Sequence, residues 1–270
     1  MICSDALKNL IYICKKSIKL STYQPVNLII LLLQPMKHLP TIPELKEGGV
    51  ILIDKPYKWT SFDAVNKIKR LSKAKIGHCG TLDPLATGLL ICCTGKFTKK
   101  ISEYQRLPKE YTGIFHLGAE TPTYDLESEP ADLKPIDNIT EEAIRAAALQ
   151  FTGDIMQVPP IHSAIKKDGK RAYELARKGR DIVMEARPVT IGEFEITAVQ
   201  LPEVHFRVLC STGTYIRSLA HDMGEALGCG AYLQELRRTK VGNFNAADAL
   251  SPDQWRDHWY PKAETAEKSN

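Results

Sequence analysis

The sequence predicts an α+β domain built on a mixed, mostly antiparallel sheet flanked by helices. Strand-like segments follow one another in runs with helices inserted, without strict β-α-β alternation, and that order favours such a sheet. The composition is that of an ordinary globular protein, 43% hydrophobic and 25% charged, and 270 residues are ample for a buried core. A disordered polar chain, a collagen and a coiled-coil rod are therefore excluded.

Two buried strands and one capped helix are predicted first along the chain. Residues 50–53 form an apolar run between Gly-Gly and Asp-Lys-Pro, which is typical of a buried strand. Thr60 can cap a helix whose apolar side chains recur at helical spacing as far as Leu71. Residues 77–81 then predict a loop, and residues 89–93 predict a second buried strand.

Half-buried strands dominate the middle of the chain. Residues 111–117, 189–199 and 204–210 alternate apolar and polar side chains, as strands with one solvent-facing side do. Between the first and second of these, Thr140 can cap a helix that has two glutamates at its positive end.

The last predicted helix has the clearest pattern. A turn over residues 211–214 precedes an apolar stripe that runs from Ile216 to Leu227 at helical spacing. Gly228 is placed to end that helix in the left-handed conformation. Further strand-like segments end near Phe244.

Three regions are predicted from these patterns. Residues 1–35 match no element of the pattern, so we expect an N-terminal extension that precedes the true start at Met36. Residues 36–250 form the folded domain, and residues 251–270 form a polar C-terminal tail. The longest apolar run, residues 28–33, is far shorter than the roughly 18 residues that a membrane-spanning helix needs, so no membrane contact is expected.

The cysteines indicate a reducing, cytoplasmic compartment. The chain has seven cysteines, an odd number. No two of them are spaced as C-x-x-C, which argues against zinc-ribbon and thioredoxin-like sites. Cys92 and Cys93 are adjacent inside an apolar run, as suits reduced thiols packed in a core.

One carboxylate stands out in the segment GHCGTLDPLATG, residues 77–88. Asp83 lies there between glycines and just before a buried strand. Asp-Pro commonly opens a turn, so a structural role explains Asp83 taken alone. An acid presented from a rigid loop beside apolar walls can equally serve as a nucleophile or a base. His78, close by in the same segment, is by itself more typical of a loop hydrogen-bonder than of a catalyst.

Basic residues cluster in two places, although the net charge is only +4, from 36 Lys and Arg against 32 Asp and Glu. The segments are residues 67–75 and residues 157–180. Such a run is usually a solvated face, but with interleaved rings it can also grip a nucleic-acid backbone. The candidate backbone contacts are Lys166, Lys167, Lys170 and Arg171.

Tyr215 and Arg217 lie where the last helix begins, away from its apolar stripe. An arginine in a first turn is slightly unfavourable for the helix dipole. We therefore expect an acid or a ligand beside Arg217, although an ordinary surface arginine explains its position equally well.

Five ordered motifs together resemble the TruB-type tRNA pseudouridine synthases. They cover roughly residues 48–245, and the combination is far more specific than any one of them. The motifs are GVILIDKP at 49–56, GHCGTLDPLATG at 77–88, KEY at 109–111, QVPPIHSAIKKDGKRAYELARKG at 157–179 and CSTGTYIRSLAHDMGEALGCGAYLQELRR at 210–238.

The resemblance implies a pseudouridine synthase fold over residues 36–250 and isomerisation of uridine 55 in the T-arm of tRNA, with no cofactor and no metal. It makes Asp83 the catalytic aspartate, with Arg217 as its partner and Tyr111 stacked on the target base. His78, Tyr215 and Leu236 would line the nucleotide pocket. We expect tRNA as the partner, and a monomer that needs no other protein.

Elementary chemistry agrees with these roles. A uridine in a folded loop must leave its stack, at a cost of about a few kcal/mol. Stacking on a ring such as Tyr111 offsets that cost by roughly 1–3 kcal/mol. Detaching uracil at N1 and rejoining it through C5 involves neither hydride transfer nor hydrolysis. The sequence leaves open whether Asp83 attacks the sugar, attacks the base or removes a sugar proton.

The sequence departs from the family pattern in two places, and two other functions are also compatible with it. Lys58 stands where the motif K-P-x-G-x-[TS]-S usually has Gly, and we expect no C-terminal PUA domain, which many members carry. The alternatives are a guide-RNA-dependent pseudouridine synthase and a tRNA-binding RNA chaperone without catalysis.

Overall fold

The computed structural model describes residues 39–161, 166–167, 170–171 and 184–261. The expected extension over residues 1–35 lies outside the described residues, as does the end of the expected tail. The domain boundaries drawn from the sequence therefore stay predictions.

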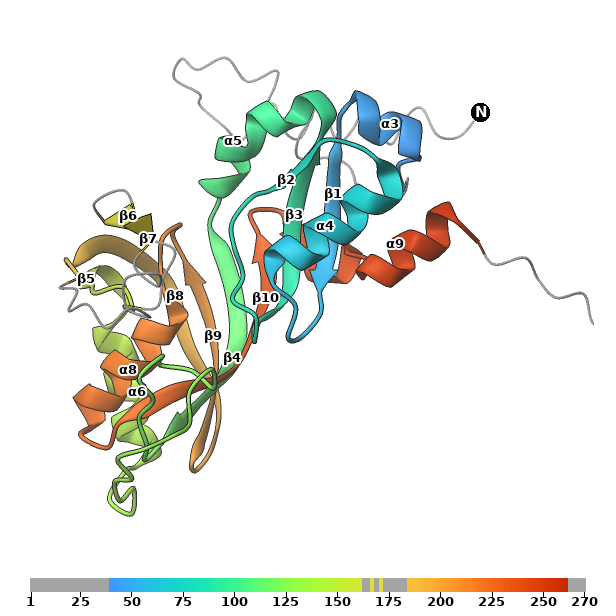
Figure 1. Cartoon of the computed structure of the whole chain (residues 1–270). Helices are drawn as coiled ribbons and strands as arrows, with labels where there is room; N and C mark the ends of the chain where they lie inside the picture. The colour runs from blue at the N-terminus through green and yellow to red at the C-terminus, as the bar shows by residue number, and fades with distance from the viewer. Residues whose placement is uncertain (1–38, 162–165, 168–169, 172–183, 262–270) are drawn as a thin grey trace, which may run out of the picture. The chain divides into compact units, whose positions relative to one another are not determined.

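A nine-stranded mixed sheet forms the centre of the described chain (Figure 1), and it confirms the predicted fold class. The strand order is β1-β3-β10-β4-β9-β8-β5, with β2 paired to β3 and β11 paired to β10. Neighbours are antiparallel except β3 and β10. The strands are β1 Val50–Lys55, β2 Ile76–His78, β3 Thr87–Thr94, β4 Lys109–Leu117, β5 Gly153–Gln157, β8 Arg187–Gln200, β9 Glu203–Cys210, β10 Ala231–Val241 and β11 Phe244–Asn245.

Helices lie along this sheet, and their bounds match the predicted ones closely where capping signals were clear. Thr60 and Thr140 accept backbone hydrogen bonds from Asp63 and Ala143 as N-caps, and Gly228 ends its helix at φ 71°. No described helix is long and apolar enough to cross a membrane. The helices are α3 Ile42–Glu47, α4 Ser61–Ser72, η1 Gly95–Lys100, α5 Ile101–Gln105, α6 Glu141–Gln150, α8 Ile216–Leu227, η2 Ala246–Asp248 and α9 Pro252–Trp259.

The main core lies where α6 and α8 cover the sheet (Figure 1). Phe115 and Phe206 stack there with ring centroids 4.1 Å apart, and Phe194 meets both rings edge-on. The apolar stripe of α8 is buried in the same cluster, with Leu219 and Met223 fully inaccessible. This packing fixes the start of α8, and therefore Arg217, against the sheet.

A second group of elements surrounds β1. α4 and α9 lie beside this strand (Figure 1), and the buried Trp255 donates from Nε1 to the carbonyl of Leu52 at 3.0 Å. Helix α9 falls in the segment expected to be only a polar tail. Its signal was present in the sequence, because Ser251 and Gln254 form a capping box around Pro252.

Several short elements were not expected. The predicted loop over residues 77–81 is wrong at its start, since Ile76–His78 pairs with β3. Three residues are too few to show an alternating pattern. The five-residue elements β5 and α5 were also missed; β5 pairs with β8, at least 30 residues further along the chain.

Candidate active site

Asp83 lies on a loop between β2 and β3 that is fixed at both of its ends. The Leu82 N–H donates to Ser61 Oγ at 2.8 Å, and that hydroxyl donates to the Leu82 carbonyl at 3.0 Å. The Ala86 N–H closes the turn onto the Asp83 carbonyl at 3.1 Å. Leu82 and Ala86 are buried, whereas the Asp83 side chain is 39% exposed. The loop therefore presents one carboxylate from a rigid, apolar base.

Two buried cations donate hydrogen bonds to backbone carbonyls in and around the same loop. Lys55 Nζ donates to the carbonyls of Pro56, Trp59 and Pro84, and Arg238 donates to the carbonyls of Leu89 at 2.7 Å and Gly80 at 3.2 Å. Burial lowers the pKa of Lys55 to about 8, and the charge of Asp83 opposes that shift. Neither residue was predicted from the sequence, because a lysine or arginine inside a strand carries no signal of being buried.

Arg217 pairs with two carboxylates. Its Nε lies 3.0 Å from Asp83 Oδ2, and its Nη1 lies 3.6 Å from Asp125 Oδ2. Nη1 also donates to the Thr123 carbonyl at 3.2 Å. The Arg217 side chain is 5% exposed, so these contacts are almost fully shielded from water. The acid expected beside Arg217 from its position in the first turn is thus Asp83.

Asp125 is a site residue that sequence reasoning did not find. Its carboxylate is 5% exposed, and Oδ1 accepts from the Glu127 N–H at 3.0 Å. Burial raises the pKa of Asp125, and the Arg217 charge opposes this. The preceding Tyr124 has φ 61° and stacks on His221 at 4.1 Å. Asp125 lies in an irregular loop with no periodic pattern, which is why it went unnoticed.

A cavity of about 330 Å³ opens beside Asp83. Tyr111 on β4 is 8% exposed, and burial raises the pKa of its hydroxyl. Tyr215 is fixed through its backbone, because Gln157 accepts from its N–H at 2.8 Å and donates to its carbonyl at 3.0 Å. Five of the six predicted pocket residues line this cavity: Asp83, Tyr111, Tyr215, Arg217 and Leu236.

His78 is the predicted pocket residue that the structure does not bring to this cavity. It is half-buried on β2, opposite Cys92 in the register. Burial lowers its pKa, with a backbone hydrogen bond at Gly80 acting in the other direction.

The four residues predicted to contact the RNA backbone lie on a short hairpin. The hairpin pairs β6, Lys166–Lys167, with β7, Lys170–Arg171. The side chains of these four residues, and most of the basic segment 157–180, lie outside the described residues.

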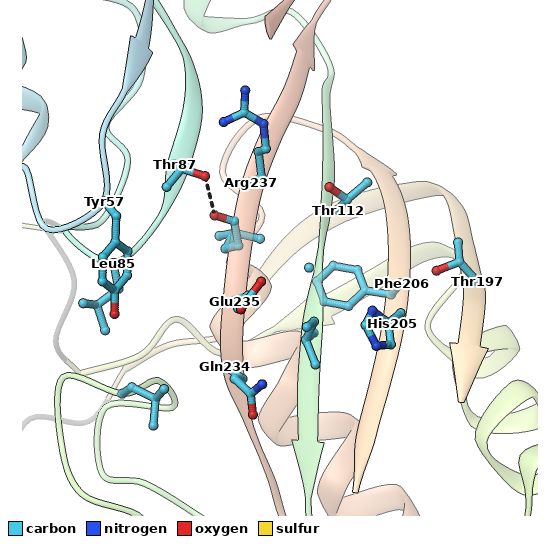
Figure 2. A pocket seen from close by; sticks show the side chains of 14 residues that line it. Tyr57, Leu85, Thr87, Thr112, Thr197, His205, Phe206, Gln234, Glu235 and Arg237 are labelled. Carbon is cyan, nitrogen blue, oxygen red and sulfur yellow. Dashed lines mark hydrogen bonds between the residues drawn. The ribbon is translucent and has the colours of Figure 1, made fainter. Parts of the chain in front are cut away.

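A larger cavity of about 760 Å³ lies on the sheet close to this site (Figure 2). Leu236 borders both cavities, and Leu85, two residues after Asp83, borders the larger one beside Tyr57. Gly113 forms part of its floor, where a Cβ would meet the Glu235 carbonyl at 2.2 Å. Figure 2 shows side chains of Gln234, Glu235 and Arg237 along β10 at its wall.

Among the residues that the structure describes, no group of three or more His, Cys, Asp and Glu side chains is arranged to hold a metal ion.

Solved structures share this architecture, which is the pseudouridine synthase fold. The chain aligns with one from a Cbf5–Nop10–Gar1 complex at TM-score 0.60 and 32% identity, covering 78% of this chain and 54% of that one. A chain from an H/ACA RNP bound to a substrate RNA containing 2'-deoxyuridine gives TM-score 0.60 and 29% identity, covering 80% and 54%. The chain thus spans about half the length of those proteins.

The fold and the family models define a pseudouridine synthase, and the sequence comparisons specify the family. Residues 68–216 match the model of the TruB family pseudouridylate synthase N-terminal domain, and residues 217–269 match the tRNA pseudouridylate synthase B C-terminal domain. The chain therefore belongs to the TruB family.

Relatives agree with that assignment. A protein named tRNA pseudouridine synthase B from Flavobacterium johnsoniae is 58% identical over 218 residues, covering 78% of this chain and 95% of its own length. Those of the same name from Phocaeicola vulgatus and Chlorobaculum tepidum are each 50% identical, and the matches cover 83% and 77% of this chain and 98% and 89% of theirs.

Proposed function

We propose that this protein isomerises uridine 55 in the T-arm of tRNA to pseudouridine. The observation that carries the proposal is the partly exposed Asp83 carboxylate, paired with a buried Arg217 at 3.0 Å beside an aromatic-lined cavity. Relatives named tRNA pseudouridine synthase B, one of them 58% identical over 95% of its own length, support tRNA as the substrate.

The reaction breaks the N1–C1' glycosidic bond and forms a C5–C1' bond, so no atom is gained or lost. A proton leaves C5 and one is taken up at N1. Asp83 is the group that acts on the nucleotide, as nucleophile or as base. The guanidinium of Arg217 balances its negative charge and fixes its direction.

The other pocket residues bind the nucleotide. Tyr111 stacks on the extruded uracil, which offsets part of the cost of unstacking it, about 1–3 kcal/mol. Tyr215 and Leu236 line the same cavity and restrict the rotation of the detached base. His78 supports the flipped-out nucleotide from outside that cavity.

The RNA backbone is held by cations. The hairpin formed by β6 and β7 contacts RNA phosphates through its four basic residues, Lys166, Lys167, Lys170 and Arg171. The protein acts as a monomer in the cytoplasm. The reduced, buried cysteines among the described residues, Cys79, Cys92, Cys93, Cys210 and Cys229, favour that reducing compartment.

Incubation of the purified protein with an unmodified tRNA transcript, followed by mapping of pseudouridine to the nucleotide, tests this function. We expect one new pseudouridine, at position 55, with no guide RNA added. Product formed only with a guide RNA would favour the guide-dependent alternative. Tight tRNA binding without product would favour the RNA chaperone.

A further inference from the structure

Aromatic side chains occur on the turn that joins β1 to α4 and on the first turn of α4. Tyr57 is 51% exposed and Phe62 is 69% exposed, with Trp59 half-buried between them. Single exposed rings are common on protein surfaces, but three within six residues form a patch that marks a contact surface.

Beside this turn lies a cavity of about 600 Å³, which we call the α4 cavity. It contains three cations and one acid. The residues that line it are Lys58, Trp59, Asp63, Asn66, Lys67, Arg70 and Leu71.

Two of its charges are already used within the protein. The Asp63 carboxylate caps α4, accepting from the Thr60 N–H at 2.9 Å and from its hydroxyl at 2.6 Å. Lys67 donates to Asp253 on α9 at 2.7 Å and lies 5.7 Å above the Trp59 ring. Across the part of the chain that the structure describes, no carboxylate pairs with Lys58 or Arg70.

Lys58 occupies this position against the preference of its backbone. Its φ is 65°, in the left-handed region that favours glycine, which is also the residue usual at this place in the family motif. Strained backbone tends to be retained where it serves a site. The strain here places a positive charge at the edge of the α4 cavity, 5.5 Å above the Tyr57 ring.

Hydrogen bonds connect the residues around the α4 cavity with the Asp83 loop. Lys55 donates to the carbonyls of Trp59 and Pro84 at once, and Ser61 in the first turn of α4 holds Leu82. Tyr57, next to Lys58, borders the larger cavity close to Asp83 (Figure 2). The turn that carries Tyr57 and Lys58 therefore borders the larger cavity at one residue and the α4 cavity at the next.

We infer that the α4 cavity binds the backbone of the same RNA whose uridine enters the Asp83 site, an inference that rests on the proposed function. Lys58 and Arg70 pair with phosphates, and the Trp59 ring packs against a sugar or a base. Cations beside accessible rings, with the one acid tied up in a cap, are the pattern of single-stranded RNA surfaces.

The test compares two double variants that remove the same charge. Lys58→Gly with Arg70→Gln changes the α4 cavity, and Lys46→Gln with Lys99→Gln changes exposed lysines on α3 and η1, outside it. Both are made in an Asp83→Asn background, so that no turnover occurs. Glycine suits the backbone at position 58 and glutamine suits a helix surface, so folding is retained.

Filter binding of an unmodified tRNA transcript across a range of salt concentrations is the measurement. We expect the α4-cavity variant to bind about tenfold more weakly near physiological salt, and its salt slope to fall by about 1.4–1.8 for two lost phosphate contacts. The control should lose at most about twofold. Trp59→Leu should lose about fivefold with an unchanged salt slope.

Equal losses in the two double variants would overturn the inference, since the effect would then be one of overall charge. Undiminished binding by the α4-cavity variant would also overturn it, and would leave this surface for a protein partner. The proposed function fails separately, if the wild-type protein binds tRNA but forms no pseudouridine.

Discussion

Arg217 and Arg207 both lie between carboxylates, but water reaches them very differently. The Arg217 side chain is 5% exposed at the start of α8, and it contacts Asp83 and Asp125. The Arg207 side chain is 32% exposed on β9 and bridges three strands. Its partners are Glu193 at 2.7 Å, Glu195 at 2.9 Å and Glu110 at 3.4 Å.

The difference in exposure decides how strongly each arginine depends on its partners. Charges that water can solvate gain little from their partners and can rearrange, so exposed pairs contribute about 0–1 kcal/mol. A buried charge depends on the few groups around it, and losing one of them leaves it poorly compensated. The Arg217 cluster therefore fixes the direction of one carboxylate at a cavity, whereas the Arg207 cluster only joins strands.

The largest effect should come from Asp83→Asn. The change keeps the size of the side chain and a hydrogen-bond acceptor, but it removes the charge and the reactive oxygen. We expect pseudouridine formation to fall to background. Affinity for tRNA should hold or improve, because a negative group near an anionic ligand is gone.

Filter binding and nucleotide analysis of the same sample measure both quantities. Asp154→Asn on β5 is a matched control at an exposed aspartate. Residual activity of Asp83→Asn within tenfold of wild type would return Asp83 to a purely structural role in the turn before Pro84.

Asp125→Asn should have the next largest effect. The substitution removes the charge of one of the two carboxylates beside Arg217, so the guanidinium can shift away from its present position. A misplacement of about 1 Å can cost roughly a hundredfold in rate, and we expect kcat to fall by about that factor. Stability should change by less than about 3 kcal/mol, since Arg217 keeps its pair with Asp83.

Single-turnover kinetics at saturating tRNA separates this effect from binding. A rise in KM with unchanged kcat would contradict the positioning role, because Asp125 would then act on RNA affinity.

Local signals predicted most of the fold. Thr60, Thr140 and Gly228 marked helix ends correctly, because caps act through hydrogen bonds between near neighbours in sequence. The order of strands in the sheet was not predictable in this way. The parallel contact of β3 with β10, for example, joins Thr87 to Arg237.

The site residues, too, were predictable only where the signal was local in sequence. Motifs identified Asp83 and Arg217, and the structure supplied their 3.0 Å contact. Asp125, Lys55 and Arg238 were missed because their roles depend on burial, which tertiary packing creates. Nothing in the local sequence distinguishes a buried lysine from the exposed ones around it.

A pH-dependent effect should come from Lys109, a buried cation at the cavity whose ammonium donates to backbone carbonyls. Its Nζ donates to the carbonyl of Leu107 at 2.7 Å and to that of Gln105. Burial lowers its pKa to about 8, and the nearby Arg238 charge adds to the shift. In the unfolded chain the same group releases its proton near its ordinary value of 10.5.

Between about pH 8 and about pH 10.5 the unfolded state therefore binds more protons at Lys109 than the folded state does. The free energy of unfolding of the wild type should rise with pH in this window, relative to Lys109→Met, by at most about 1.4 kcal/mol per pH unit. Urea unfolding of the two proteins at several pH values measures the difference. A constant difference across the window would contradict the depressed pKa.

The smallest effect should come from Arg207→Gln, although it removes three ion pairs. Glu193 and Glu195 are more than half exposed, so water replaces the lost cation. Burial alone would raise the pKa of Glu110, but hydrogen bonds from Thr239 at 2.8 Å and Lys240 at 3.0 Å lower it, and both remain in the variant. We expect a loss of about 1 kcal/mol in the free energy of unfolding at low salt, and a smaller loss as salt screens the pairs.

Urea unfolding at low and high salt measures this loss, with turnover on tRNA as the second readout. Turnover should stay within twofold of wild type, and a large drop would mean that the exposed cluster takes part in the site after all.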